Sequence, residues 1–475
     1  MLVSVCFFIS MILKKYSQYN SINMKTKYIL ASISILALFI LIACSSLKKT
    51  MQGATTISPS DTALFRLVQQ QTFRYFWDGA EPNSGLARER IHTDNIYPQK
   101  DAGTVTSGGG GFGVMAILVG MERNFITRQQ GLERLEKIVG FLETADRFHG
   151  AWPHWWHGET GKVKPFSRKD DGGDLVETSF MLQGLLCVRQ YYKDGSPAEK
   201  KLAARADKLW REVEFDWYRN GKNVLYWHWS PNFDWQMNFA VRGYNECLVM
   251  YVLAASSPTH GVPTEVYHQG WADSGKIKEP REALGYKMQL RHHGSKNGGP
   301  LFWAHYSYLG LDPRGLKDQY ADYWMENQHQ ALINYQWCVN NIKGFKGYGP
   351  DSWGLTSSYS VKGYSGHAPA EQRDLGVIAP TAALASFPYT PAQSMAAMKH
   401  WYNDMKDKLW GPYGFYDSFS ETDNWFPARY LAIDQGPIVV MMENYRSGLL
   451  WNLFMSCPEV KLGLKKLGFQ SPHLK

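Results

Sequence analysis

Acidic side chains recur near the start of apolar segments along this chain. Asp170, Asp174 and Glu177 lie in KDDGGDLVET, Glu246 lies in RGYNECLVMYVLAA, and Asp434 lies in AIDQGPIVVMMENY. Each apolar segment is expected to form a helix, which places every acid close to a helix N-terminus. Acids at equivalent helix ends predict a single site. Paired carboxylates among aromatic side chains are typical of enzymes that cleave glycosidic bonds.

Each of these acids also has a structural interpretation. Asp174, with Glu177 three residues later, fits a helix N-cap and a capping box. Glu246 can pair with Arg242 four residues earlier, and Asp434 can cap the turn that contains Pro437. In the functional interpretation, burial raises the pKa of Glu246 and makes it a general acid, while Asp434 is the base that activates water.

Aromatic residues are abundant, with 18 Trp, 27 Tyr and 23 Phe, and many lie in connectors where a helical core does not need them. Flat aromatic faces suit a carbohydrate groove. The candidates for stacking are Trp152, Trp155, Trp156, Trp227, Trp229, Trp235, Trp353 and Trp425, of which about half are expected in the groove and the rest in the core. The candidates for polar contacts with sugar are His154, His157, His228 and Arg242. No metal site is predicted, because no helical motif of acids and histidines accompanies them.

Apolar periodicity predicts twelve helices. Their approximate ranges are 59–77, 112–123, 128–148, 174–192, 197–217, 243–256, 263–272, 300–308, 323–343, 379–387, 391–408 and 436–452, with a short tail helix at 457–467. Apolar helices alternate with longer amphipathic ones, so the apolar ones belong inside and the others outside. Twelve helices in two alternating layers predict an all-α fold, an (α/α)6 barrel whose inner helices open at one face with their N-termini.

Four long connectors, 79–110, 149–173, 218–240 and 344–378, are rich in Gly, Trp, Tyr and His and are expected to be functional loops. The run from Gly108 to Gly113 fits GxGxxG but lacks the βαβ context of a dinucleotide site. It is expected to be a flexible approach to an inner helix. Residues 223–229 (NVLYWHW) are the best candidate for a strand.

The N-terminal region carries a targeting signal. Lys25 and Lys27 precede an apolar run that ends in LIAC at Cys44. A basic start, an apolar middle and a small residue before the cleavage point are typical of a signal peptide. Residues 1–43 are therefore expected to be removed, with Met24 as the true start. The ending resembles a bacterial lipobox, so Cys44 is expected to carry lipid and residues 44–58 to form a tether before a single domain at 59–475. The residues after Cys44 (SSLKKT) lack an acidic run, which favours an anchor facing the periplasm. The alternative is an ordinary membrane anchor, but the run is short for a span.

Charge and cysteines exclude some classes of protein. The formal net charge is +8, and four of the lysines lie in the segment expected to be removed. A mildly basic chain without blocks of like charge does not favour nucleic acid as a partner. Cys187, Cys247 and Cys338 fall in apolar segments without metal-ligand spacing and are expected to be buried free thiols, with a disulfide as the alternative in an exported protein. We expect a monomer without a cofactor.

Four long segments carry a resemblance to a known family. They are PHWWHGETGKVKPFSRKDDGGDLVETSFMLQGLL, MNFAVRGYNECLVMYVLAASSPTH, GPDSWGLTSS and NWFPARYLAIDQGPIVVMMENYRSGLLW. In this order they resemble the glycoamylase-like family of bacterial β-1,2-glucanases, glycoside hydrolase family 144. The resemblance runs from about residue 64 to residue 469.

The resemblance implies an (α/α)6 barrel, inverting hydrolysis of β-1,2-glucan or sophoro-oligosaccharides, and no cofactor. It implies that Glu246 is the proton donor, directly or through a substrate hydroxyl, and that Asp434 is the base. It also implies that Asp170, Asp174 and Glu177 line the substrate site. A hydrolase or lyase of another polysaccharide and a non-catalytic glycan-binding lipoprotein stay open as alternatives, and the sequence does not decide between endo and exo cleavage.

Overall fold

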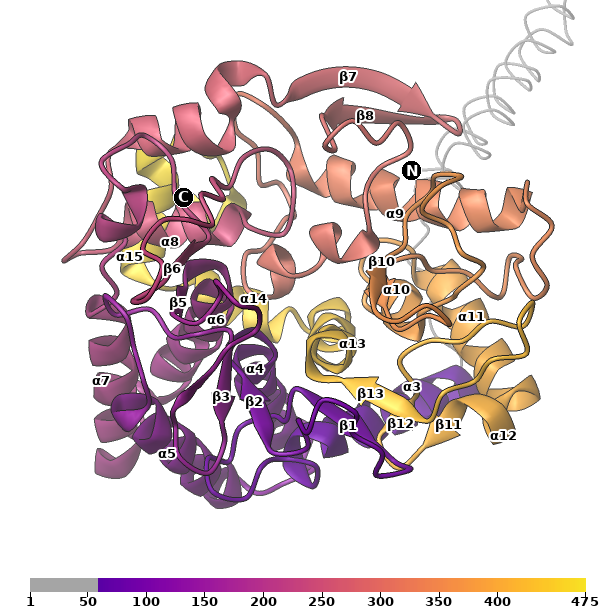
Figure 1. The fold of residues 1–475 in the computed structure, drawn as a ribbon, viewed down its shortest axis with the longest axis horizontal. Coiled ribbons are helices and arrows are strands. Elements are labelled where there is room, and N and C mark those ends of the chain that lie inside the picture. The colour runs from indigo at the N-terminus through magenta and orange to yellow at the C-terminus, as the bar shows by residue number, and fades with distance from the viewer. Residues whose placement is uncertain (1–58) are drawn as a thin grey trace, which may run out of the picture. The chain divides into compact units, whose positions relative to one another are not determined.

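Helical segments alternate between an inner and an outer layer in the computed structural model, which describes residues 59–475 (Figure 1). The inner layer consists of α4 (Ser107–Glu122), α6 (Leu175–Tyr192), α8 (Leu248–Ser256), the 3₁₀ turns η4 (Leu301–Ala304) and η5 (Ser307–Leu309), α10 (Pro380–Leu384) and α13 (Ala432–Arg446). The outer layer consists of α3 (Pro59–Trp77), α5 (Arg128–Thr144), α7 (Pro197–Arg211), the π-helical η2 (Val266–Trp271), α9 (Tyr323–Asn340) and α11 (Pro391–Asp404). The predicted (α/α)6 barrel is confirmed. The predicted signal peptide, the start at Met24, the lipidation of Cys44 and the tether to residue 58 lie outside the described residues.

Burial explains the two layers. Every residue of α4 from Ser107 to Met121 is buried, whereas α5 buries one face, which consists of Gly131, Leu132, Leu135, Ile138, Val139 and Leu142. An all-apolar helix is stable only inside, and an amphipathic one covers it. The predicted capping boxes begin the outer helices, Thr127 with Gln130 at α5 and Ser196 with Glu199 at α7.

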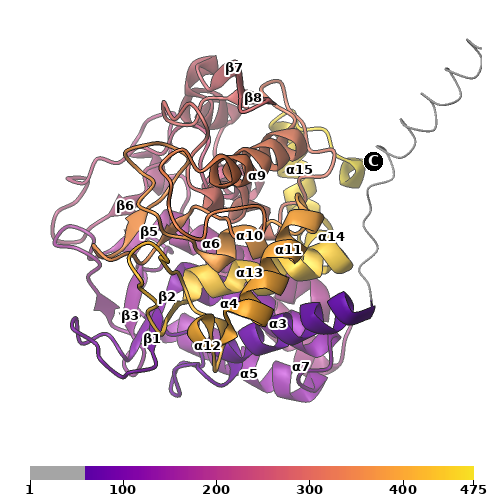
Figure 2. The same cartoon turned by 90° about the vertical axis from the view of Figure 1, so that its right-hand side faces the viewer.

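Short strands gather at one end of the barrel, where the connectors lie (Figure 2). The strands that pair there are β1 (Arg90–His92) with β13 (Arg429–Leu431), β2 (Thr104–Thr106) with β3 (Trp155–His157) and β4 (Val163–Lys164), and β5 (Gly173–Asp174) with β6 (His228–Trp229). The other pairs are β7 (Lys278–Ala283) with β8 (Tyr286–Leu290), β9 (Ser357–Ser358) with β10 (Ser365–Gly366), and β11 (Trp410–Gly411) with β12 (Gly414–Phe415). The candidate strand at 223–229 is thus reduced to its last two residues.

The glycine run is not a flexible approach, as the sequence suggested, but the first turns of α4. A Cβ on Gly111 would lie 2.4 Å from the backbone of Phe180 and Met181, and one on Gly108 would lie 2.2 Å from Oε2 of Glu177. The glycines therefore let α4 approach α6 closely, and packing overrides their low helix propensity.

The single helix predicted at 436–452 is two helices in the structure. The structure divides it into α13 and α14 (Leu449–Met455), because Gly448 adopts a left-handed φ of +71° between them. α15 (Pro458–Lys466) follows as the predicted tail helix, and the short α12 (Lys406–Leu409) follows α11.

Two further properties bear on the sequence expectations. Cys187, Cys247, Cys338 and Cys457 are buried free thiols. Within residues 59–475, none of the helices combines the length and the apolar character needed to cross a membrane.

Candidate active site

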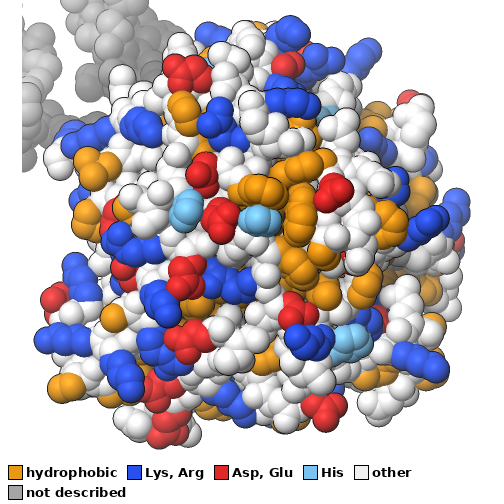
Figure 3. Space-filling model, turned by 60° about the vertical axis from the view of Figure 1, so that its left-hand side comes forward, with side chains coloured by type: hydrophobic (Ala, Val, Ile, Leu, Met, Phe, Trp, Pro, Cys, Tyr) orange, Lys and Arg blue, Asp and Glu red, His pale blue; other side chains and the backbone are white. Residues whose placement is uncertain are grey.

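A cavity of about 790 Å³ opens among the connectors at the end of the barrel that carries the strands. Its acidic lining residues are Glu89, Asp170, Glu177 and Glu246. Its aromatic lining residues are Trp155, Phe166, Phe180, Trp227, Phe239, Phe302, Tyr306, Tyr359 and Tyr364. Figure 3 shows hydrophobic side chains gathered on one face of the molecule, with acidic and histidine side chains beside them. The lining combines apolar stacking surfaces with a few polar groups, as in sites for small ligands.

The starts of the inner helices supply the acids. Glu177 lies in the first turn of α6, Glu246 two residues before α8, and Asp434 in the first turn of α13. The prediction that these acids reach one end of the barrel therefore agrees with their placement. Glu177 and Glu246 line the cavity, whereas Asp434 lies behind its neighbours Leu431 and Ile433, which do line it.

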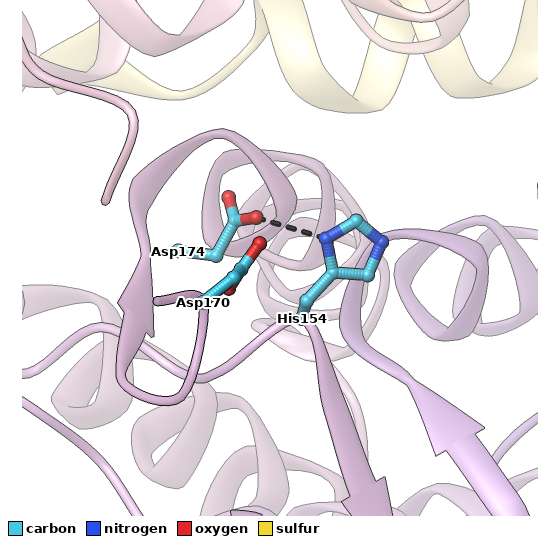
Figure 4. A group of neighbouring side chains, drawn as sticks. All are labelled: His154, Asp170 and Asp174. Carbon is cyan, nitrogen blue, oxygen red and sulfur yellow. Dashed lines mark hydrogen bonds and ion pairs between the residues drawn. The ribbon is translucent and has the colours of Figure 1, made fainter. Parts of the chain in front are cut away.

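Asp174 anchors the start of α6. Its Oδ1 accepts the N–H of Glu177, and its Oδ2 accepts Nδ1–H of His154 and Nε1–H of Trp227 at 3.0 and 2.9 Å. The side chain is fully buried. Asp174 is thus an N-cap, as its structural interpretation predicted. It also holds two side chains of the cavity wall in place, Trp227 and His154, and Figure 4 shows its bond to His154.

The surroundings favour the charged form of His154 and the neutral form of Glu177. Burial opposes charge on His154, but Glu177, Asp174 and Asp170 raise the pKa of His154 to about 10, so it carries a proton at neutral pH. Burial, together with the charges of Asp174 and Glu89, raises the pKa of Glu177 to about 8. The backbone N–H of Gly108 donates to Glu177 at 2.8 Å.

Glu246 has the environment of a proton donor. It is 7% exposed and lines the cavity. Burial raises its pKa from the ordinary 4.5 to about 7, and the charge of Asp174 adds to this. A carboxyl that keeps its proton near neutral pH can deliver it to a leaving oxygen. Its predicted partner Arg242 instead donates to the carbonyl of Gln269 and lies near Asp273, outside the cavity lining.

Asp434 is 1% exposed and has an acidic neighbour, Asp417, which is equally buried. Burial, and then the charge of Asp417, raise the pKa of Asp434 well above its ordinary value. Burial also raises the pKa of Asp417, to about 6. The hydroxyl of Tyr306, which lines the cavity, lies 3.5 Å from Oδ1 of Asp434.

The remaining predicted residues are divided between the cavity and other places. Trp155 lines the cavity beneath the guanidinium of Arg90, which lies 5.5 Å from its ring. His157 is exposed and lies outside the lining. Trp229 packs on His149 and Trp217, not on the cavity.

Trp353 is completely buried and donates Nε1–H to the carbonyl of Gln393, so it belongs to the core. Trp425 is half-buried in a connector, and it does not line the cavity either. Of the other tryptophan candidates, Trp227 lines the cavity.

Sequence reasoning missed Glu89, Asp417 and Tyr306. Glu89 directly precedes β1, and Asp417 lies in the connector after β12. Neither acid stands at the start of an apolar helix, which was the pattern used to select candidates. Tyr306 lies between two 3₁₀ turns and gave no signal distinct from the other 26 tyrosines.

His154, Asp170 and Asp174 bring one ligand atom each within 4.8 Å of one another, a spacing that fits a metal ion (Figure 4). Their donor chemistry fits it poorly. Asp174 already accepts three N–H groups, and His154 holds a proton on the nitrogen that faces it. Metal ligands must be deprotonated, so binding would break these hydrogen bonds.

Buried carboxyls with raised pKa values beside an aromatic-lined cavity, carried by an (α/α)6 barrel, define the class of the protein as a glycoside hydrolase. Comparison with known proteins narrows the class. The glycoamylase family, described as "Putative glucoamylase", matches residues 238–458. The chain is 71% identical to the solved endo-β-1,2-glucanase from Chitinophaga pinensis, in complex with sophorotriose and glucose. That match covers 88% of this chain and 100% of the other, with a TM-score of 0.87.

A curated relative is the exo β-1,2-glucooligosaccharide sophorohydrolase (non-reducing end) of Parabacteroides distasonis, 46% identical over 432 residues. The match covers 87% of this chain and 59% of that protein, so the chain spans little more than half of the relative. The endo-β-1,2-glucanase from Talaromyces funiculosus, solved with sophorose, is 11% identical. It shares the fold, with a TM-score of 0.62 over 84% of this chain and 86% of the other. The chain belongs to the glycoamylase-like family of β-1,2-glucanases.

Proposed function

We propose that the protein hydrolyses β-1,2-glucan with inversion at the anomeric carbon. The observation that carries the proposal is that Glu246 and Asp434, held in different surroundings, both interact with one cavity residue, Tyr306. The Tyr306 hydroxyl donates a hydrogen bond to Oδ1 of Asp434, and the charge of Glu246 contributes to the raised pKa of Tyr306. The high identity to a β-1,2-glucanase over the whole length of that enzyme supports the choice of substrate.

In this mechanism Glu246 gives its proton to the leaving glycosidic oxygen, directly or through a substrate hydroxyl, as the C1–O bond breaks. Asp434 removes a proton from the water that forms the new bond to C1 on the opposite face. An inverting enzyme needs an acid and a base on opposite sides of the scissile bond. The raised pKa of Glu246 suits a proton donor. The pKa of Asp434 is raised as well, so Asp434 can act as a base only if it ionises, and this depends on its partner Asp417.

Sugar rings are expected to stack along the cavity rim. Phe166, Phe239 and Tyr364 line the cavity and yet are 48%, 54% and 55% exposed. Large apolar side chains left this open around a cavity suit a ligand that covers them. Glu89 and Asp170 complete the polar lining and are proposed to bind sugar hydroxyls.

We infer endo action. The relative at 71% identity, matched over its entire length, is an endo-β-1,2-glucanase, whereas the exo-acting relative is less similar and much of its length has no counterpart in the match. A spread of oligosaccharides from linear β-1,2-glucan is the expected product pattern.

The cellular location is a separate proposal. We propose that the chain is exported and anchored through lipid on Cys44, facing the periplasm, and that it acts as a monomer. The support is the apolar run that ends in LIAC. Metabolic labelling with a palmitate analogue should mark the full chain and not Cys44→Ser. Equal labelling of both would refute the lipid anchor.

The test of the activity uses the chain without residues 1–44 and linear β-1,2-glucan, with products followed by size and by the anomeric signals in NMR. Oligosaccharides of mixed length that first appear as the α-anomer support inverting endo hydrolysis. Sophorose alone would show exo action, β-anomers would refute inversion, and an unchanged polymer would refute the proposed substrate.

A further inference from the structure

Two buried carboxyls from distant segments, Asp417 and Asp434, interact with each other through a side-chain hydrogen bond and through charge. Asp417 follows β12 and Asp434 lies in the first turn of α13, and each is 1% exposed. Oδ1 of Asp417 and Oδ2 of Asp434 are buried without any N–H or O–H donor among the described residues. Two like-charged oxygens in such a place are stable only if they share a proton.

The surroundings decide which of the two carries the charge. Oδ2 of Asp417 accepts the N–H of Tyr359 at 2.8 Å and the hydroxyl of Ser418 at 3.2 Å. Among residues 59–475, Asp434 accepts a hydrogen bond only from the hydroxyl of Tyr306, at 3.5 Å. The other ionisable groups that interact with the pair are Glu89, Arg90, Tyr306, Tyr359 and Tyr364.

Arg90 favours the anion on Asp417, and Glu89 disfavours it on Asp434. Hydrogen bonds to an ionised carboxylate stabilise its charge. Asp417 accepts more hydrogen bonds than Asp434, so Asp417 is the anion and Asp434 holds the shared proton. An Asp434 that is already protonated is not a base by itself.

We propose that Asp417 and Asp434 act as one base, in which Asp434 meets the attacking water and passes its own proton on to Asp417. This inference rests on the proposed function and deepens it. Neither carboxyl is part of the cavity lining, but Oδ1 of Asp434 lies 3.5 Å from the hydroxyl of Tyr306, which is, whereas Asp417 has no hydrogen bond to a cavity-lining side chain among the described residues. Asp417 acts through Asp434 and is a positioning residue rather than a group that contacts substrate.

The proton balance is complete. One O–H bond of water breaks as the oxygen bonds to C1, and that proton goes to Oδ1 of Asp434. The proton on Oδ2 of Asp434 moves to Oδ1 of Asp417, which neutralises the pair. Glu246 meanwhile loses one proton to the leaving oxygen. After product release the pair returns one proton to solvent and Glu246 regains one, so no other reactant is needed.

Asp417→Asn tests the relay. The asparagine oxygen can still accept from Tyr359 and Ser418, and its NH2 group takes the place of Oδ1, where it can donate a hydrogen bond but cannot take up a proton. Asp434 must then ionise itself, buried beside Glu89, and has no partner to which it can pass a proton. We expect kcat to fall about 100-fold or more, the usual worth of a general base. We expect KM to stay within about threefold, because the cavity wall is unchanged.

The pH profile separates the relay from a structural role. The acid limb of kcat/KM reports the free enzyme's base, and in the wild type it should lie above the usual range of an aspartate, because burial raises the pKa of Asp417. In Asp417→Asn the limb should move away from its wild-type position, because Asp434 then titrates without the charge and the shared proton of Asp417. Ser418→Ala removes one donor from the Asp417 anion and should move the limb to higher pH by a smaller amount, with most of kcat retained.

Asp374→Asn is the matched control. Asp374 is also 1% exposed, but it accepts hydrogen bonds from Trp337 and Tyr348 away from the cavity. Its replacement should lower the melting temperature and leave the acid limb in place. A limb that does not move in Asp417→Asn, whether or not kcat falls, would overturn the relay.

A readout without substrate distinguishes this inference from the proposed function. NMR titration of the Asp carboxyl carbons should show two coupled steps for the pair in the wild type and one step for Asp434 in Asp417→Asn. Two independent titrations in the wild type would overturn the shared proton. A wild type that leaves β-1,2-glucan intact but titrates as a coupled pair would instead refute the proposed substrate.

Discussion

Glu246→Gln should make the protein inactive and, at alkaline pH, more stable. Glutamine has the shape of the protonated glutamate and cannot donate a catalytic proton, so we expect kcat to fall about 10²- to 10⁴-fold. The gain in stability has a different origin. Glu246 is buried with a pKa of about 7 in the folded protein and an ordinary value of 4.5 when exposed. Its ionisation is therefore harder in the folded state than in the unfolded state.

The size of the effect follows from the pKa. One pKa unit corresponds to about 1.36 kcal/mol, so the rise from 4.5 to about 7 corresponds to roughly 3 kcal/mol. A raised carboxyl pKa costs nothing below pH 4.5, where both states are protonated. The cost grows as pH rises and is complete above the folded pKa. Glu246→Gln removes this cost, so its stabilisation should be near zero at pH 4.5 and about 3 kcal/mol at pH 8.

Differential scanning calorimetry at the two pH values measures this difference. For a domain of this size, 3 kcal/mol corresponds to about 3 °C in melting temperature. Glu443→Gln is the control, because Glu443 is also fully buried but accepts from Arg123 at 2.7 Å. Its loss should lower the melting temperature at pH 8 instead of raising it. A melting temperature of Glu246→Gln that equals the wild type at both pH values would show that Glu246 is not desolvated, and the argument for its role as the acid would fail with it.

Three further results are expected. The alkaline limb of kcat/KM should fall near pH 7, because Glu246 must be protonated; a profile flat to pH 9 would contradict this. Phe166→Ala should raise KM about tenfold with kcat within twofold, because it removes a stacking surface of about 1.4 kcal/mol from the exposed rim; an unchanged KM would exclude Phe166 from substrate binding. Gly111→Ala should lower the melting temperature through a cost of about 1–3 kcal/mol or more, since its Cβ meets backbone at 2.4 Å, whereas Gly140→Ala on α5 meets nothing closer than 3.5 Å and should be neutral or stabilising. Equal melting temperatures for the two glycine variants would show that α4 and α6 can separate at no cost.

The barrel could be predicted from the sequence because the two layers differ in pattern. An inner helix such as α4 is apolar on all sides, and an outer helix such as α7 has one apolar face and a capping box. These are local properties of the chain. The break at Gly448 escaped notice because the apolar pattern continues across it, and only the left-handed backbone separates the two helices.

The residues of the site were harder to predict from the sequence than the fold. Trp155 and Trp353 both lie in aromatic connectors, but one lines the cavity and the other packs in the core. That difference arises from packing between distant segments. Asp417 has no periodic or capping pattern around it, and its position beside Asp434 depends on how the connector after β12 crosses the start of α13. Residue type alone could not have paired them.

The pairing of β1 with β13 has a consequence for how the protein folds. Arg90 lies opposite Leu431, so these strands join the two ends of the domain across most of its length. Closing a loop of several hundred residues costs roughly 5 kcal/mol of chain entropy, and such distant contacts form slowly. Glu89 and Ile433 border these strands and both line the cavity. Recovery of activity on refolding should therefore lag behind recovery of helical circular dichroism, since no fragment of the barrel contains both edges of the site.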